Sequence, residues 1–382
     1  MNRRFAFRAG AAAVAVGLAG FGTWILSLPA AAATEGAPAI DSRETEALVE
    51  ALKPPKRQRP VVAILGINEA TETTDYLLPY GILRRADVAD VMTLSTKPGP
   101  VALFPALEVQ PDATVAAFDA RYPEGADYVI VPAMSRDDDR AALTWIRSQA
   151  AAGAIVIGVC AGAKVVGEAG LLDGRRATTH WYYVRELRKE NPAVTYTPDR
   201  RLVLDRGVMT TTGITASMPM SLTLIEAIAG RDRALAVAHN LGLTKWDARH
   251  DSGAFTLTRP FALTVLGNVL AFWNREDLGI EVSSGIDEVS LALVADAWSR
   301  TYRSRAVTFA GTPGTIVSRN GLRIIPDRES TTWPAERLLP AIGSQPPARA
   351  LAGTLEQIRG RYGSRTARIV AMQLEYPEQE TR

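Results

Sequence analysis

The one cysteine of this 382-residue chain, Cys160, stands between an apolar run and a helical pattern. Residues 154–159 are apolar and predict a buried strand, and the small residues after Cys160 are typical of a closely packed helix start. A strand–turn–helix corner with Gly158 and Gly162 around the cysteine indicates a nucleophile elbow. The positive end of the following helix would favour the thiolate over the thiol. The other interpretation of a lone cysteine is a small buried hydrophobic residue without chemistry.

The elements that must position this corner alternate along the chain. Apolar strands are expected at 61–66, 90–94, 128–132, 154–159 and 207–213, and helices at 76–85, 136–152, 220–229 and 261–273. Strands that are apolar on both faces and alternate with helices predict an α/β fold, a mostly parallel sheet with helices on both faces. Ligands of such sheets gather at the carboxyl ends of the strands, and Cys160 follows one of these ends.

Two stretches around the cysteine resemble the ThiJ/PfpI (DJ-one/PfpI) superfamily. They read Gly-Val-Cys-Ala-Gly-Ala at 158–163 and Gly-Glu-Ala-Gly-Leu-Leu-Asp-Gly-Arg-Arg-Ala-Thr-Thr-His-Trp at 167–181. The pattern is most similar to the branch that includes isonitrile hydratase and the amidase-like sensor halves of AraC-type regulators. The resemblance spans about residues 61–243 and implies a flavodoxin-like, glutamine amidotransferase-like fold.

The resemblance assigns roles to three side chains. Cys160 matches the nucleophile, His180 matches a histidine near the pocket, and Asp75 matches an acid that faces the cysteine. A carboxyl that stays protonated beside a thiolate can donate a hydrogen bond to it, while the imidazole would move the proton. The structural alternatives are a helix-capping Asp75 and a hydrogen-bonded His180. We read His239 and His250 as structural or exposed, and we expect neither a metal nor a cofactor, since no histidine pair has metal-ligand spacing with the cysteine.

The expected oxyanion and pocket groups are the backbone N–H groups near Ala161, Gly162, Ala133 and Met134. Ala133 and Met134 stand where the family usually has two glycines, so their side chains would narrow the pocket or reorient the backbone N–H groups. Pro219 stands where the family usually has an aspartate, and Ala161 brings no polar side chain for proton transfer. These departures weaken the case for an enzyme.

Residues 1–33 have the composition of an export segment. Three arginines precede an uncharged apolar run at 9–33, and the alanines at its end are typical of a signal-peptide cleavage site. The run is also long enough to span a bilayer uncut, and the positive charge before it would place the following domain outside the cytoplasm. We therefore expect an exported protein, either periplasmic or anchored in the inner membrane, with a linker at residues 34–60.

Residues 280–382 form a C-terminal α/β extension after a ThiJ/PfpI-like domain at 61–279. At an offset of 215, residues 91–112 align without gaps with residues 306–327 and share a threonine, a Pro-Gly pair, a leucine and a Pro-Asp pair. One interpretation is a decayed partial repeat, and the other is chance, because the offset was chosen by inspection. We expect a final strand at 368–374, where a repeat would hold no cysteine.

The charge balance bears on the class of partner. Lys and Arg total 43 against 41 Asp and Glu, and a net charge of +2 leaves no electrostatic footprint for nucleic acid.

Two functions remain open. One is a cysteine-dependent hydrolase, hydratase or lyase acting on a small amide, nitrile-like or carbonyl compound, and the other is a non-catalytic ligand or redox sensor. The resemblance also implies a homodimer, since relatives often dimerise, and a structural or partner-binding role is a third alternative.

Overall fold

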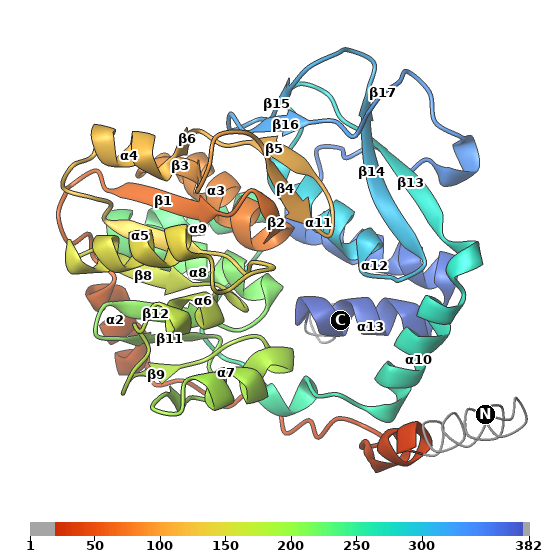
Figure 1. The fold of residues 1–382 in the computed structure, drawn as a ribbon, viewed down its shortest axis with the longest axis horizontal. Coiled ribbons are helices and arrows are strands. Elements are labelled where there is room, and N and C mark those ends of the chain that lie inside the picture. Colours follow the sequence, from red (N-terminus) through yellow and green to blue (C-terminus); the bar gives the residue numbers. More distant parts are fainter. Residues whose placement is uncertain (1–19, 377–382) are drawn as a thin grey trace, which may run out of the picture.

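The computed structural model describes residues 20–376 of the chain (Figure 1). Most of the predicted export segment therefore lies outside the described residues, and its export stays a prediction. Within the described range no helix is both long enough and apolar enough to cross a membrane. A short helix at 20–27 leads into an extended stretch that reaches the folded domain.

A seven-stranded sheet lies at the centre of the predicted domain, in the order β11-β12-β8-β7-β1-β3-β6. Its strands are β1 (Val61–Gly66), β3 (Asp90–Ser95), β6 (Ala113–Thr114), β7 (Tyr128–Val131), β8 (Ile155–Gly158), β11 (Leu202–Asp205) and β12 (Val208–Thr211). Neighbours pair in parallel except β11 and β12, which form an antiparallel pair at one edge. The mostly parallel α/β sheet predicted from the sequence is confirmed.

Helices cover both faces of this sheet. One face carries α3 (Thr73–Ala86), α8 (Ser217–Ala229) and α9 (Arg231–Leu241), and the other carries α4 (Val115–Arg121), α5 (Arg140–Ala151) and α6 (Gly162–Glu168). In Figure 1, α5 lies in front of the strands and α8 and α9 lie behind them. Alternate residues of β1 enter the two cores, Val62 and Ile64 on the α8 side and Ala63 and Leu65 on the α5 side. A strand buried on both faces explains why β1 is apolar throughout.

The predicted linker at 34–60 is part of the fold. It contains α2 (Ser42–Ala51), which contacts α8. Just after α2, Leu52 is fully buried and its carbonyl accepts the Tyr128 hydroxyl at 2.7 Å. The alanine-, proline- and charge-rich composition suggested a spacer because the residues that hold this segment lie far away in the sequence.

The predicted strand at 368–374 is wrong, because these residues form a helix. They belong to α13 (Ser364–Leu374), which follows α12 (Pro347–Tyr362). Thr366, Ile369, Val370 and Leu374 are buried, at the spacing of one helix face. A short apolar run cannot distinguish a strand from a buried helix by pattern alone, which explains the error.

The C-terminal region adds two sheets to the molecule (Figure 1). One is parallel and consists of β13 (Glu276–Glu281), β14 (Ser304–Ala310) and β17 (Arg328–Glu329), with α11 (Glu288–Ser299) between β13 and β14. The other runs β15-β16-β5-β4-β2 and joins both regions through β15 (Ile316–Val317), β16 (Arg323–Ile325), β5 (Glu108–Gln110), β4 (Val101–Phe104) and β2 (Glu69–Glu72). The extension is therefore packed against the first domain by shared strands.

The C-terminal region also repeats hydrogen bonds of the first region at the 215-residue offset. The Thr93 N–H donates to the Asp112 carboxylate at 2.8 Å, and the Thr308 N–H donates to the Asp327 carboxylate at 2.7 Å. In each pair the aspartate N–H donates back to the threonine hydroxyl, at 3.1 Å and 3.0 Å. The strand pairs β3–β6 and β14–β17 keep the same register. The two segments thus have the same local structure, and we call them the first and second copies.

The two copies face each other about an approximate twofold axis. The equivalent strands β5 and β16 pair antiparallel, and the equivalent helices α3 and α11 pack together. Arg85 in α3 pairs with Asp287 at the start of α11 at 2.6 Å. Arg300 at the end of α11 pairs with Glu72 at the start of α3, also at 2.6 Å. In each copy, therefore, an arginine forms an ion pair with the acidic residue that caps the equivalent helix of the other copy.

Candidate active site around Cys160

Cys160 lies at the corner between β8 and α6. Its φ of 56° falls in the left-handed region, which side chains other than glycine rarely adopt. Its N–H donates to the Thr211 hydroxyl at 3.1 Å, and its carbonyl accepts the Thr179 hydroxyl at 2.9 Å. A strained backbone held by such bonds is typical of functional sites and of the nucleophile elbow. The strand–turn–helix corner expected from the sequence is present.

Gly162 lets this corner pack directly on the end of β7. A Cβ at this position would lie 2.0 Å from the Val131 carbonyl oxygen and 2.9 Å from the Pro132 carbonyl. Atoms do not approach so closely, so any side chain would push the elbow away from β7. The glycine is therefore required by the path of the backbone.

The thiol of Cys160 is not activated by its surroundings. Only 4% of the residue is exposed. Burial, followed by the nearby carboxyl groups of Asp75, Glu72 and Glu375, raises the pKa of the Cys160 thiol well above its usual value. A hydrogen bond from the Ala161 N–H acts in the opposite direction but is outweighed. The thiolate expected from the helix N-terminus is therefore corrected to a protonated thiol.

Asp75 lies in the first turn of α3 and is fully buried. Its Oδ2 accepts the Ala133 N–H at 3.1 Å, while its Oδ1 has no hydrogen-bond partner within residues 20–376. Burial and the nearby charge of Glu72 raise the pKa of the Asp75 carboxyl well above its usual range. A neutral carboxyl has an O–H to donate, and the unpaired oxygen is where that proton can reside. Asp75 and Cys160 are thus two protonated groups within electrostatic reach of each other.

Arg300 brings a positive charge from the second copy to this site. Its guanidinium lies 2.6 Å from Glu72 and 2.8 Å from Asp296. Burial alone would lower the pKa of Arg300, but the two carboxylates outweigh it. Glu72 also accepts the Asp75 N–H at 2.6 Å. The Arg300–Glu72 pair therefore links the second copy to the Asp75 end of the site, and no sequence motif pointed to it.

Three of the four predicted oxyanion donors are engaged in internal bonds. The Ala133 N–H is bound to Asp75, and the Ala161 N–H is bound to the cysteine sulfur. The Gly162 N–H donates to the Val159 carbonyl at 2.7 Å. Met134 lies opposite Thr71 of β2 in an isolated bridge whose hydrogen bonds are made by the neighbouring residues. Stabilisation of an anion by these groups stays a prediction, and the first three would have to exchange their present partners.

His180 is also buried and fully bonded. Its Nδ1 accepts the Tyr182 N–H at 3.2 Å, so its Nε2, 3.0 Å from the Gln373 carbonyl, carries the proton and donates. Burial lowers the pKa of His180, which favours the neutral ring. The Nε2 therefore joins the His180 loop to α13, the Nδ1 holds the loop itself, and proton transfer by His180 stays a prediction.

Glu375 was not expected from the sequence. It follows α13, adopts a φ of 49°, and is 1% exposed. Its carboxylate accepts the N–H groups of Trp181 and Gly213, each at 2.8 Å, and lies 3.5 Å from His250. Although burial acts to raise it, the pKa of Glu375 is lowered by His180, His250 and the two N–H donors. A charged carboxylate from the end of α13 thus covers the elbow region and helps to keep the nearby thiol protonated.

A cavity of about 450 Å³ lies beside the elbow. Thr179, Trp181, His250 and Phe255 line it, together with the extended stretch around residue 31. Among the described residues Cys160 is not part of this lining, but the Thr179 hydroxyl donates to its carbonyl. The space available to a small molecule is therefore next to the cysteine rather than over it.

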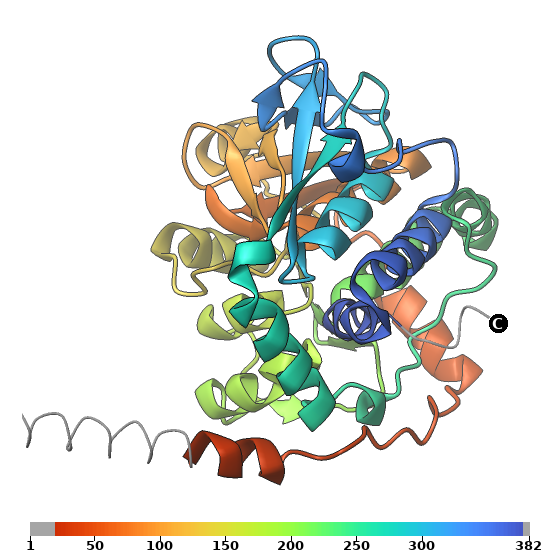
Figure 2. The ribbon, with the colours of Figure 1, turned by 90° about the vertical axis from the view of Figure 1, so that its right-hand side faces the viewer.

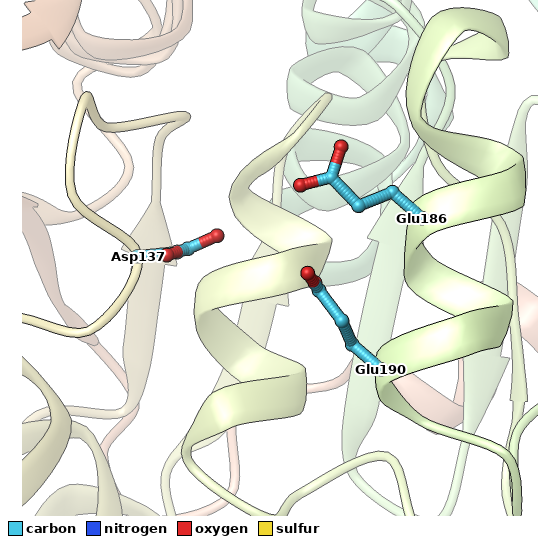
Figure 3. Close-up of side chains that lie close together, drawn as sticks. All are labelled: Asp137, Glu186 and Glu190. Atoms are coloured by element: carbon cyan, nitrogen blue, oxygen red, sulfur yellow. The ribbon is translucent and has the colours of Figure 1, made fainter.

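A second group of ionisable side chains lies on the other side of the elbow helix. Figure 3 shows Glu186 and Glu190 of α7 (Val184–Glu190) and Asp137 of a loop turned toward one another. The ammonium of Lys164 in α6 lies 2.5 Å from both Asp137 and Glu186 and 3.8 Å from Glu190. Burial would lower the pKa of Lys164, but these carboxylates raise it. The lysine supplies the positive charge that the acids require, so we infer no metal site there.

Comparison with known proteins places this geometry in a family. The sequence profile of the DJ-1/PfpI family matches residues 61–227. Isonitrile hydratase of Pseudomonas putida is 44% identical over 101 residues, 26% of this chain and 42% of that protein. The HTH-type transcriptional regulator CdhR of Pseudomonas aeruginosa is 33% identical over 111 residues, 29% of this chain and 33% of that regulator.

The chain spans less than half the length of these curated relatives. Among solved structures, a ThiJ/PfpI family protein from Pseudomonas syringae has a TM-score of 0.47 and 20% identity, with 62% of this chain and 93% of that one covered. The resemblance read from the residues around Cys160 and His180 is confirmed. Residues 61–227 of this chain, less than half of its length, match the DJ-1/PfpI family.

Proposed function

We propose that the chain adds water to a small carbon–nitrogen compound of the isonitrile or nitrile type, with Cys160 as the nucleophile and Asp75 as the acid. One observation carries this proposal: a thiol on a strained elbow lies within electrostatic reach of a buried carboxyl whose pKa is raised and whose second oxygen has no partner among residues 20–376. The similarity to isonitrile hydratase supports the choice of substrate class. A raised thiol pKa suits a reaction in which the thiol and a proton both add to the substrate.

The proposed reaction with an isonitrile has two steps. In the first, the terminal carbon gains a bond to the Cys160 sulfur and a proton from Asp75, while the thiol proton passes to the Asp75 carboxylate. The product is a thioimidate on the enzyme. In the second, water adds across the carbon–nitrogen double bond of the thioimidate, with its oxygen on carbon and one proton on nitrogen; the carbon–sulfur bond then breaks and the hydroxyl proton passes to the sulfur. The sum is one isonitrile and one water converted into one N-substituted formamide, with no change of oxidation state.

Arg300 supports these steps through charge. A thiolate forms transiently in each step, and a guanidinium close to the site lowers the free energy of that anion. The substrate would enter through the cavity beside Thr179, which requires the thiol to become accessible from that side. The end of α13, where Glu375 is bound, is the segment whose displacement would open this path.

The test is turnover of a small alkyl isonitrile by the full chain, with formamide production followed by proton NMR. Cys160→Ser should abolish turnover, and Asp75→Asn should lower kcat at least tenfold while the thermal midpoint changes little. Asp87→Asn is the matched acid-to-amide control, because Asp87 is exposed at the end of α3 and pairs with Arg59. Full activity of Cys160→Ser would contradict the proposal, as would an equal loss in Asp75→Asn and Asp87→Asn.

A non-catalytic ligand or redox sensor is the second candidate. The observation in its favour is the burial of Cys160, which also raises the pKa of its thiol, since an inaccessible thiol reacts slowly with substrates. A sensor predicts saturable binding of small molecules in the cavity beside Thr179, or oxidation of Cys160 by peroxide, without formamide production. We propose that either activity operates outside the cytoplasm, in the periplasm or at the inner membrane, on the strength of the arginine-led apolar segment at residues 1–33. The homodimer implied by the family stays a proposal, tested by the mass of the full chain in solution.

A further inference from the structure

Large apolar side chains on the surface gather on two segments. Within residues 20–376, thirteen large apolar residues are exposed, and eight of them belong either to the helix at 20–27 or to α10 (Arg259–Leu270) and the short turn that follows it. These eight are Phe21, Trp24, Leu26, Leu263, Val269, Leu270, Phe272 and Trp273. The other five are scattered singly over other elements, which is normal for a protein surface. We call Leu263, Val269, Leu270, Phe272 and Trp273 the α10 surface.

The polarity of α10 is inverted relative to a helix of a water-facing domain. Residues 260–274 contain no charged side chain. Of the helix itself, only Phe261 and Asn268 are buried. The Asn268 amide donates to the Thr301 carbonyl at 2.9 Å and to the Thr366 hydroxyl at 3.1 Å. The polar residue therefore points into the protein while aliphatic residues point out, and a helix that is apolar toward its surroundings requires an apolar partner.

The α10 surface is continuous with the helix at 20–27. The Arg259 N–H donates to the Pro29 carbonyl at 2.8 Å, and its guanidinium donates to the Leu26 carbonyl at 2.8 Å. Figure 2 shows α10 along the face turned to the viewer, with the red segment of residues 20–27 at its lower end. Residues 9–19, which lead into that segment, are uncharged and apolar. The exposed apolar residues of the two segments thus lie next to each other, and the sequence that precedes them is itself of a kind that favours lipid.

The residue types at the far end of α10 fit the boundary between lipid and water. Phe272 and Trp273 are 65% and 71% exposed, and the exposed Arg275 follows them. Aromatic rings with arginines beside them favour the headgroup level of a bilayer, where the ring is partly buried and the cation remains hydrated. A helix of this length does not cross the hydrocarbon but can lie in the interface.

We infer that the α10 surface docks on a lipid bilayer, so that the domain rests against the membrane through α10 in addition to any contact made by the N-terminal segment. The occupant is lipid rather than a second copy of the chain, because the segment at residues 20–27, which is bonded to the start of α10, follows directly on the uncharged apolar sequence of residues 9–19. The Cys160 site then lies at a fixed orientation to the membrane.

The test places a reporter on α10 in the full chain. Cys160 is the only native cysteine and is buried, so a thiol-reactive, polarity-sensitive fluorophore will label Leu270→Cys, and separately Trp273→Cys, without labelling the elbow. Leu235→Cys is the matched control, because Leu235 is 43% exposed on α9, which packs on α3 and α8. The labelled chains are bound to vesicles of phosphatidylcholine and phosphatidylglycerol with and without a nitroxide-bearing lipid.

We expect the labels at positions 270 and 273 to shift to shorter wavelength on the vesicles and to be quenched by the nitroxide lipid, while the label at 235 does neither. If the chain does not bind vesicles, or if it binds and both α10 labels still report water, the inference is overturned. A shift that appears without lipid and grows with protein concentration also overturns it, because the α10 surface would then pair with a second copy.

Discussion

Replacing Arg300 by methionine tests the contact between the two copies. Arg300 lies 2.6 Å from Glu72 and 2.8 Å from Asp296, and its side chain is 14% exposed. Methionine keeps an unbranched side chain but removes the charge, so both acids lose their cation. Removing one partner of a buried ion pair costs about 3–5 kcal/mol. With an unfolding entropy of about 2.1 cal/mol/K per residue, a chain of this length should lose about 4–6 °C in its thermal midpoint.

The size of this loss should depend on pH. Burial raises the pKa of Asp296 to about 7 even though Arg300 acts to lower it. A group whose folded-state pKa is raised contributes stability below its unfolded pKa, and that contribution is lost as the pH rises through the folded pKa. Without Arg300 the folded pKa moves higher still. The difference between the variant and the native chain should therefore widen above about pH 7 and narrow below it.

Arg85→Met is the matched control, because Arg85 has the equivalent place in the first copy. Its partner Asp287 keeps Arg319 at 3.3 Å and the N–H groups of its own helix start, so the loss should be smaller, about 1.5–3 kcal/mol. Differential scanning calorimetry between pH 5.5 and 8.5, in roughly half-unit steps, measures both variants. Equal midpoints for the two variants, or a loss in Arg300→Met that does not grow with pH, would refute the reasoning.

Two further predictions concern the elbow. The rate of Cys160 alkylation by iodoacetamide, read by mass spectrometry across pH, should rise only above the usual pKa range of a thiol. Glu375→Gln should move that rise to lower pH, because one of the charges that raise the thiol pKa is lost. A rise already complete at pH 7 in the native chain would contradict this. Gly162→Ala should lower the free energy of unfolding by about 3 kcal/mol, since the added methyl group would meet the Val131 carbonyl. Gly353→Ala should not, because Gly353 lies at an open position inside α12. Equal midpoints of the two variants in thermal melts would show that the elbow is loosely packed.

Much of the first domain could be predicted because its signals are local. The run of apolar residues before Cys160 and the small residues after it describe one corner, and a corner of this kind needs no distant partner to be identified. The same locality explains the errors. The pKa of the Cys160 thiol is raised in part by Glu72 and Glu375, which lie far away in the sequence. The sequence showed only the start of the following helix, which indicated a lowered thiol pKa.

The C-terminal contacts could not be predicted for the same physical reason. His180 carries a family motif, yet its ring is bonded to the Gln373 carbonyl, 193 residues further on. The shared Thr and Asp residues of the two copies were visible at a constant offset because in each copy they bond the start of one strand to its parallel neighbour. Arg300 and Glu72 gave no such signal, since an ion pair between two helices leaves no pattern of spacing within either one.

The twofold arrangement of the two copies has a consequence for how the molecule assembles. Two separate subunits would associate only above some concentration, whereas copies joined by one polypeptide meet at an effective concentration set by the connecting chain. Their pairing should therefore survive dilution. Covalent linkage also removes the demand that both partners be alike, so the second copy can place Arg300 against Glu72 of the first without itself carrying a cysteine.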